Sequence, residues 1–295
     1  MSRVRELDSK KLITPPNHVV EGVQYEVMMG SVAYGVSNDT SDIDIYGFSI
    51  PPKEIIFPHL KGEILGFGRQ TKRFEQYQQH HIYDSGPQKE YDITIYNIVK
   101  YFQLVMENNP NMIDSLFVPQ RCVLYCTRIG EHVRSNRKVF LHKGGFHKFK
   151  GYAFSQLNKT KKKNPEGKRK EIVDKYGYDL KFATHLVRLL NEIEQILIEG
   201  DLDLERNREQ LKSIRRGEWK LQEIEDYFTQ KERSLEDLYS RSSLPYGPDE
   251  KTIKNILMEC LEEYYGSLDN CIKKDSDSNM ILNELKEIVR KYDRG

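Results

Sequence analysis

The chain has 295 residues, a formal net charge of +1, 38% hydrophobic residues and 31% charged residues. This balance is typical of a folded globular protein rather than of a disordered or membrane-embedded chain. No apolar run approaches the roughly 18 residues that a membrane helix needs, and the charged start is unlike a signal peptide, so we expect a cytoplasmic protein. The four cysteines contain no second close pair to complete a four-thiolate zinc site, and the length favours about two domains.

Two neighbouring strands are predicted near the start of the chain. Residues 25–29 form a short apolar run that ends at Gly30, and apolar residues alternate with polar ones over 43–48, which is the period of a strand. Residues 31–41 between them are polar and rich in turn-forming types. This composition predicts a loop that opens with a short helix.

A β-hairpin and two helices are predicted next. Residues 74–83 and 90–96 are rich in aromatic and β-branched side chains and are separated by a Ser-Gly-Pro turn, which predicts a hairpin. Residues 97–107 carry apolar side chains at helical spacing, and an Asn-Pro pair ends that helix. We expect a second short helix over residues 111–117.

The remainder of the chain is predicted to be helical, so we place a domain boundary near Gly144 and divide the chain into residues 1–144 and 145–295. Within the second part, Lys159 to Lys170 carries seven basic side chains against one acid. This segment is predicted to be a loop that is either simply solvated or in contact with the phosphates of an RNA partner. Amphipathic helices are predicted over residues 146–160, 179–199, 221–239, 249–265 and 280–292.

Asp42 and Asp44 are the first candidates for chemistry. They are two residues apart on a predicted strand, so both carboxylates project from one face while Ile43 and Ile45 bury the other. Adjacent carboxylates repel each other, and a hard divalent cation bound through oxygen relieves that repulsion. We predict a magnesium site, with manganese as the alternative ion, although an isolated Asp-x-Asp more often only solvates a surface strand.

Asp92 is the predicted third carboxylate, because it too lies on a strand with an apolar back face. Asp84, near the hairpin turn, is the alternative ligand, and the strand context favours Asp92. Three carboxylates and two metal ions suit phosphoryl transfer. His80 and His81 resemble a metal-binding pair, but adjacent strand residues face opposite sides, so we discount them.

Gly30 and Ser31 lie just upstream, at the end of the first predicted strand. The missing side chain at Gly30 lets the backbone approach a phosphate, and the Ser31 hydroxyl can donate a hydrogen bond to it. A following helix N-terminus would add amide donors. Neither the Gly-Ser pair nor Asp-x-Asp is strong evidence alone; their order and spacing together indicate a nucleotide site.

Lys181, His185 and Arg188 form a second candidate group, spaced by four and three residues so that they share one helix face. Opposite the carboxylates, this cationic face would bind a triphosphate or a nucleic-acid phosphate, with bidentate contacts from Arg188 and a donated hydrogen bond from His185. The alternative is a solvated face on which Arg188 forms an ordinary ion pair with Glu192.

The order strand, Gly-Ser, loop and Asp-x-Asp resembles the signature of the DNA polymerase beta-like nucleotidyltransferase superfamily. The details resemble its RlaP branch, predicted nucleotidyltransferases often associated with RNA ligases in RNA repair. That branch often has Glu where this chain has Asp114. The resemblance covers roughly residues 20–220 and is carried by Gly30-Ser-Val-Ala-Tyr-Gly35, Ser41-Asp-Ile-Asp-Ile-Tyr-Gly47, Asp92-Ile-Thr-Ile-Tyr96, Asn109-Pro-Asn-Met-Ile-Asp-Ser-Leu-Phe117 and Lys181-Phe-Ala-Thr-His-Leu-Val-Arg-Leu-Leu190.

The resemblance implies an α+β fold: a nucleotidyltransferase core with a mixed β-sheet flanked by helices, followed by an all-helical C-terminal domain, with the active site in the cleft between them. It implies two metal ions bound by Asp42, Asp44 and Asp92, with Gly30 and Ser31 holding the triphosphate of an incoming nucleotide. The implied reaction transfers a nucleoside monophosphate to a hydroxyl and releases pyrophosphate.

The favoured acceptor is an RNA 3′ end, such as that of a tRNA, because of the family's association with RNA repair and the basic segment. One alternative is a hydroxyl of a protein or a small molecule. A different class of function is a catalytically idle nucleotide- or RNA-binding module. The retained carboxylates argue against the idle module, since inactive members usually lose them.

Overall fold

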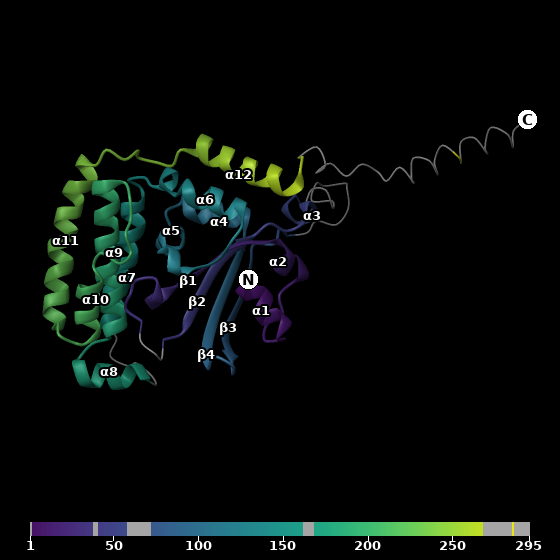
Figure 1. Ribbon diagram of the computed structural model, residues 1–295. Coiled ribbons are helices and arrows are strands. Elements are labelled where there is room, and N and C mark those ends of the chain that lie inside the picture. Colours follow the sequence, from purple (N-terminus) through teal and green to yellow (C-terminus); the bar gives the residue numbers. More distant parts are fainter. Residues whose placement is uncertain (1, 38–40, 58–71, 162–167, 268–284, 286–295) are drawn as a thin grey trace, which may run out of the picture.

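The computed structural model describes residues 2–37, 41–57, 72–161, 168–267 and 285 (Figure 1). A mixed sheet forms the core of the first half, with the strand order β3-β4-β2-β1-β5. β2 and β4 run parallel, whereas the other neighbouring pairs are antiparallel. The strands are β1 (Val23–Met29), β2 (Ile43–Ser49), β3 (Gln76–Asp84), β4 (Lys89–Asn97) and β5 (Val123–Cys126).

The register of β2 fixes the position of its carboxylate. Asp44 lies opposite Asp92 of β4 on one side and opposite Met29 of β1 on the other. Ile45 and Ile93 point to the other face of the sheet and are fully buried. The two strands were predicted as separate segments, and their parallel pairing brings their carboxylates side by side.

Helices cover both faces of the sheet (Figure 1). One face packs with α1 (Arg3–Ser9) and α2 (Asn17–Gly22) in a small apolar cluster, and the other packs with α4 (Ile98–Met106) and α5 (Pro110–Phe117) in the main core. The predicted hairpin, formed by β3 and β4, and the two predicted helices, α4 and α5, are confirmed. Other elements of the first half are α3 (Lys53–Ile56), α6 (Arg128–Ser135) and 3-10 turns at Gly30–Val32, Gln120–Cys122 and Arg137–Phe140.

The second half consists of helices in the described residues, as predicted. α9 begins after Asp179, whose side chain accepts hydrogen bonds from two backbone amides, and it ends at Gly200 in the left-handed region with a φ of 60°. None of the described helices is long and apolar enough to cross a membrane. The helices are α7 (Gly145–Thr160), α8 (Lys168–Tyr176), α9 (Leu180–Glu199), α10 (Arg208–Arg215), α11 (Leu221–Arg241) and α12 (Glu250–Tyr265).

The main apolar core continues across the expected boundary at Gly144. Phe140 before the boundary and Phe149 after it belong to the same buried cluster. α12 turns back to pack on α4 and α6 rather than on the bundle of α7, α9 and α11 (Figure 1). The division into residues 1–144 and 145–295 stays a prediction, and the helix expected at 280–292 lies outside the described residues except at Leu285.

Candidate active site

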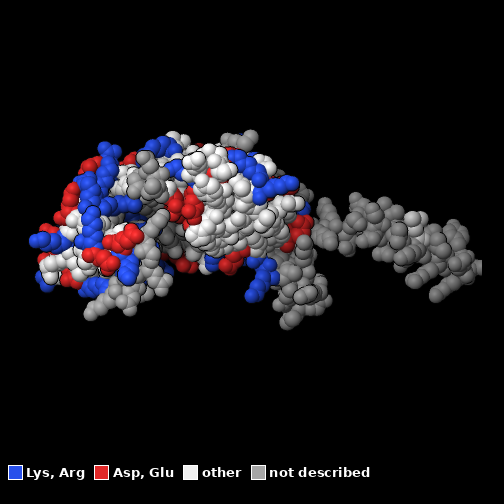
Figure 2. Space-filling view, turned by 90° about the horizontal axis from the view of Figure 1, so that it is seen from below, with Lys and Arg blue, Asp and Glu red and all other residues white. Residues whose placement is uncertain are grey.

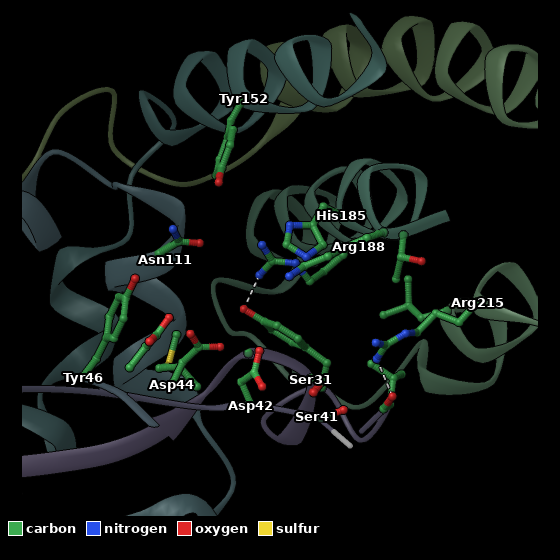
Figure 3. Close-up of a pocket in the computed structure, with 18 residues that line it drawn as sticks. Ser31, Ser41, Asp42, Asp44, Tyr46, Asn111, Tyr152, His185, Arg188 and Arg215 are labelled. Carbon is green, nitrogen blue, oxygen red and sulfur yellow. Dashed lines mark hydrogen bonds between the residues drawn. The ribbon is translucent and has the colours of Figure 1, made fainter. Parts of the chain in front are cut away.

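A pocket of about 430 Å³ lies between the sheet and α9 (Figure 3). β2 and β4 supply carboxylates from one wall, while α9 supplies basic side chains from the other. The structure therefore brings together the two groups that the sequence singled out, although the role of each residue stays a prediction. The pocket is lined by Gly30, Ser31, Asp42, Asp44, Asp92, Lys181, His185 and Arg188, among others.

The surroundings of Asp44 shift the pKa of its carboxylate. Burial raises its pKa, and the negative charges of Asp92 and Asp42 raise it further, while Lys181 opposes the shift. The pocket therefore holds more negative charge on its sheet wall than burial favours, and a cation would relieve this repulsion. Oxygen ligands of this kind fit a hard divalent ion such as Mg²⁺.

Asp92, rather than Asp84, is the third carboxylate of the pocket. Asp84 does not line the pocket, and its carboxylate pairs with Lys10 at 2.6 Å. Both oxygens of Asp92 contact the edge strand β3. Among the described residues, no three His, Cys, Asp or Glu side chains lie close enough together to hold a metal ion as they stand. The donor set fits a divalent metal in chemistry, with Asp42, Asp44 and Asp92 as the residues that would hold it.

Gly30 gives the Asp44 carboxylate its space. Its φ of +65° lies in the left-handed region, and a Cβ at this position would sit 2.1 Å from Oδ2 of Asp44. The 3-10 turn over Gly30–Val32 then carries Ser31 into the pocket. From the sequence, glycine was expected here because it lets a phosphate approach the backbone. The structure shows a second reason, which is that the Asp44 carboxylate occupies the space that a Cβ at Gly30 would fill.

The basic wall carries less charge than its sequence indicates. Burial, together with the charges of the neighbouring cations Arg188 and Lys181, lowers the pKa of His185 to about 3. His185 is thus neutral at physiological pH and can donate one hydrogen bond without adding charge. Lys181 is exposed and acts on Asp44 across the pocket.

Arg188 is buried in a polar cluster rather than displayed on a solvated face. Its Nη1 donates to Tyr34, to Asp114 and, at 3.2 Å, to Glu192. Although burial opposes its charge, Glu192, Tyr34 and Asp114 raise the pKa of Arg188. The expected pairing with Glu192 is present, but it is internal, and Arg188 joins α9 to α5 while also lining the pocket.

The pocket contains residues that sequence reasoning missed. Tyr46, Asn111 and Tyr152 point toward one another at one end, and Arg215 lies at the other end (Figure 3). Tyr46 follows Asp44 by two residues, so strand periodicity predicts the shared face that the structure shows. Tyr152 and Arg215 come from α7 and α10, where no local pattern marks them.

The basic segment Lys159 to Lys170 differs from the single loop that was predicted. Its first residues end α7 and its last ones begin α8, while residues 162–167 lie outside the described part of the chain. Lys161 pairs with Glu225 at 2.7 Å, and Arg169 lies over the ring of Phe182. Figure 2 shows many Lys and Arg side chains over the helical part of the molecule, with Asp and Glu side chains among them and at the hollow beside it.

Comparison with known proteins agrees with this geometry. A family model described as "RlaP: RNA repair pathway DNA polymerase beta family" matches residues 4–242. The chain belongs to the RlaP family. The match spans the sheet, the pocket and the helices through α11, so both walls of the pocket lie inside the RlaP region. The family is thus polymerase beta-like and linked to RNA repair by its description.

Other comparisons add little to the RlaP assignment. A solved structure of a nucleotidyltransferase-like protein from Exiguobacterium sibiricum 255-15 is similar at 10% sequence identity, covering 79% of this chain and 73% of that chain. Its TM-score is 0.29, so no argument on function rests on it. No curated protein matches this chain.

Replacing Gly30 with Ala is expected to disturb the metal site. The new Cβ displaces Oδ2 of Asp44, and the affinity for Mn²⁺, measured by titration calorimetry, should fall on the order of 10- to 100-fold, the range seen when the support of a metal ligand is lost. Gly177→Ala is the matched control, because Gly177 has a φ of +81° but nothing within 4 Å of the added carbon. Both variants carry a similar backbone strain of about 1 kcal/mol, so equal Mn²⁺ affinity in the two would contradict the assignment.

His185 is expected to make folding stability depend on pH. The unfolded chain binds a proton near its ordinary pKa of 6.5, whereas the folded protein resists protonation down to about pH 3, so stability falls as pH decreases through this window. From pH 6.5 to 5 the loss should be about 1 kcal/mol, allowing for solvent screening in the partly open pocket. Urea unfolding of the His185→Gln variant should show a shallower decline than the parent; parallel curves would refute this.

Proposed function

We propose that this RlaP protein transfers a nucleoside monophosphate from a nucleoside triphosphate to a hydroxyl group and releases pyrophosphate. The observation that carries the proposal is the register that pairs Asp44 with Asp92 in a pocket whose opposite wall presents Lys181. A nucleoside triphosphate bound with a divalent metal carries both negative and positive charge. In this pocket the carboxylates lie opposite Lys181, so the metal would face the carboxylates and the phosphates would face Lys181. The family description supports the same chemistry.

Each wall of the pocket has a part in the proposed reaction. Asp42, Asp44 and Asp92 would hold Mg²⁺ or Mn²⁺, which when bound would neutralise the triphosphate and lower the pKa of the attacking hydroxyl. Ser31 and the backbone at Gly30 bind the triphosphate by hydrogen bonds.

The basic wall has its part when pyrophosphate leaves. Negative charge builds up on the leaving group as its bond to the transferred phosphorus breaks, and Lys181 stabilises that charge. His185 is neutral, because burial and the nearby cations lower its pKa. It therefore donates a hydrogen bond to the same phosphates but carries no positive charge that would attract the carboxylates of the opposite wall.

The proposed acceptor is an RNA 3′ end, with tRNA as one instance. Support comes from the RNA repair link in the family description and from the basic side chains gathered on the helical side of the pocket (Figure 2). Lys159 lies near the end of α7 and Lys170 near the start of α8. Because phosphate contacts by Lys and Arg release bound counterions, RNA binding at this surface should weaken steeply with salt.

The direct test supplies Mg²⁺ and α-labelled nucleoside triphosphates together with separate pools of RNA, DNA and total protein. Label is expected on RNA, at its 3′ end. Periodate oxidation of the RNA before the reaction should therefore block labelling. Label on protein alone would overturn the RNA acceptor while keeping nucleotidyl transfer. Absence of label from every pool, with small-molecule products also absent, would overturn the proposed activity.

Asp44→Asn is the matched catalytic variant, because it keeps the shape of the side chain and removes its charge. We expect incorporation to fall on the order of 1000-fold or more while the thermal midpoint changes little, since loss of a charged group at the reacting centre removes stabilisation worth several kcal/mol. Asp237→Asn, at an exposed carboxylate on α11 paired with Arg241, is the control and should keep full activity. Retained activity in Asp44→Asn would contradict the site.

A further inference from the structure

The edge strand β3 contains a β-bulge directly opposite Asp92. Gln79 pairs with Ile93 and Ile82 pairs with Tyr91, so the two residues between them on β3 face a single residue on β4. The second of the two, His81, has a φ of 55° in the left-handed region, which histidine tolerates better than most residues. The expectation that adjacent histidines face opposite sides of the strand fails here, because the bulge interrupts the alternation.

Both histidines contact the same carboxylate through different atoms. The backbone N–H of His81 donates to Oδ1 of Asp92 at 2.8 Å, and Nδ1 of His80 lies 3.1 Å from Oδ2. The imidazole of His81 turns away and contacts Glu90 instead. Asp92 is therefore carried by β4 but held by β3 at both oxygens, and each oxygen keeps a further lone pair for another partner.

Two glutamines on β3 set the tautomer of His80. The amide nitrogen of Gln78 lies 2.7 Å from Nε2 of His80, and an amide nitrogen only donates, so Nε2 accepts and the ring proton resides on Nδ1, facing Asp92. Gln76 in turn donates to the amide oxygen of Gln78 at 3.2 Å, and all three side chains lie exposed on the edge strand. These contacts form a continuous polar chain that ends at the pocket.

We propose that His80 is a positioning residue that holds the Asp92 carboxylate in one orientation for metal binding, with Gln78 fixing the tautomer of His80. The inference rests on the proposed function, since it assumes that Asp92 is a metal ligand. Repulsion between Asp44 and Asp92 on adjacent strands favours an Asp92 side chain that leans toward β3, on the side of β4 away from Asp44, and a partly exposed side chain there needs a partner to hold it in one orientation. The hydrogen bond from His80 on β3 holds the carboxylate in one orientation, as outer-sphere partners do for other metal-binding carboxylates, and leaves a lone pair on each oxygen for the metal.

Binding of Mn²⁺ alone, followed by electron paramagnetic resonance without nucleotide, tests the inference. His80→Leu removes the donor and should weaken Mn²⁺ binding about tenfold. In His80→Asn the amide nitrogen takes the place of Nδ1, so Mn²⁺ affinity should return to within about threefold of the parent. This result would show that the Leu variant loses the hydrogen bond and not only packing. His81→Asn tolerates the left-handed backbone and changes only the side chain that faces Glu90, so it should bind Mn²⁺ like the parent.

A spectroscopic signature separates positioning from a merely structural role. In ¹⁵N spectra of the metal-free protein, His80 should show a protonated Nδ1 and an unprotonated Nε2, and Gln78→Leu should replace this with the tautomer mixture of a free histidine. A protonated Nε2 in the parent, or parental Mn²⁺ affinity in His80→Leu, would overturn the inference alone. Absence of Mn²⁺ binding in the parent would overturn it together with the metal assignment, whereas normal Mn²⁺ binding without nucleotidyl transfer would contradict only the proposed function.

Discussion

A buried guanidinium joins the two halves of the pocket. Arg188 on α9 reaches Asp114 on α5 and Tyr34 in the turn region after β1, and it lies over the Tyr34 ring. Burial raises the pKa of Glu192 well above its ordinary value, the charge of Arg188 opposes this shift, and the charge of Asp114 adds to it. An unpaired charge at this depth would cost several kcal/mol, so α9 has one favourable docking position.

This docking position fixes how the pocket walls face each other. Lys181 lies two turns before Arg188 on the same helix, so the position of Arg188 against α5 also sets the position of Lys181 across from Asp44. The sheet wall is anionic, the helical wall is cationic, and the missing side chain at Gly30 leaves room for the Asp44 carboxylate. The separation of charge that supports nucleotidyl transfer therefore depends on a contact outside the reacting centre.

The sequence predicts local features of this site well. Gly30, Ser31, Asp42 and Asp44 lie within one short stretch, and strand periodicity alone places both carboxylates on one face. The same reasoning prefers Asp92 to Asp84, and the structure puts only Asp92 in the pocket. The mixed sheet with flanking helices, followed by helices, is also confirmed, because long periodic segments such as α9 carry strong signals.

Features that depend on distant contacts escaped prediction. Arg188 meets Asp114 and Tyr34 across 74 and 154 residues of sequence, and no local pattern encodes such pairs. α1 was also missed, since its start depends on the buried carboxylate of Glu26 on β1, which accepts hydrogen bonds from Ser2, Arg3 and Val4. The bulge in β3 breaks the alternation on which the strand argument relies.

The most direct measurement of the central claim is a crystal structure of the protein with Mn²⁺ and a non-hydrolysable nucleoside triphosphate. Anomalous Mn²⁺ density is expected between Asp44 and Asp92, with the triphosphate lying between that density and Lys181 and its oxygens against the Gly30-Ser31 backbone. Mn²⁺ or triphosphate bound elsewhere, with this pocket empty at saturating concentrations, would contradict the account.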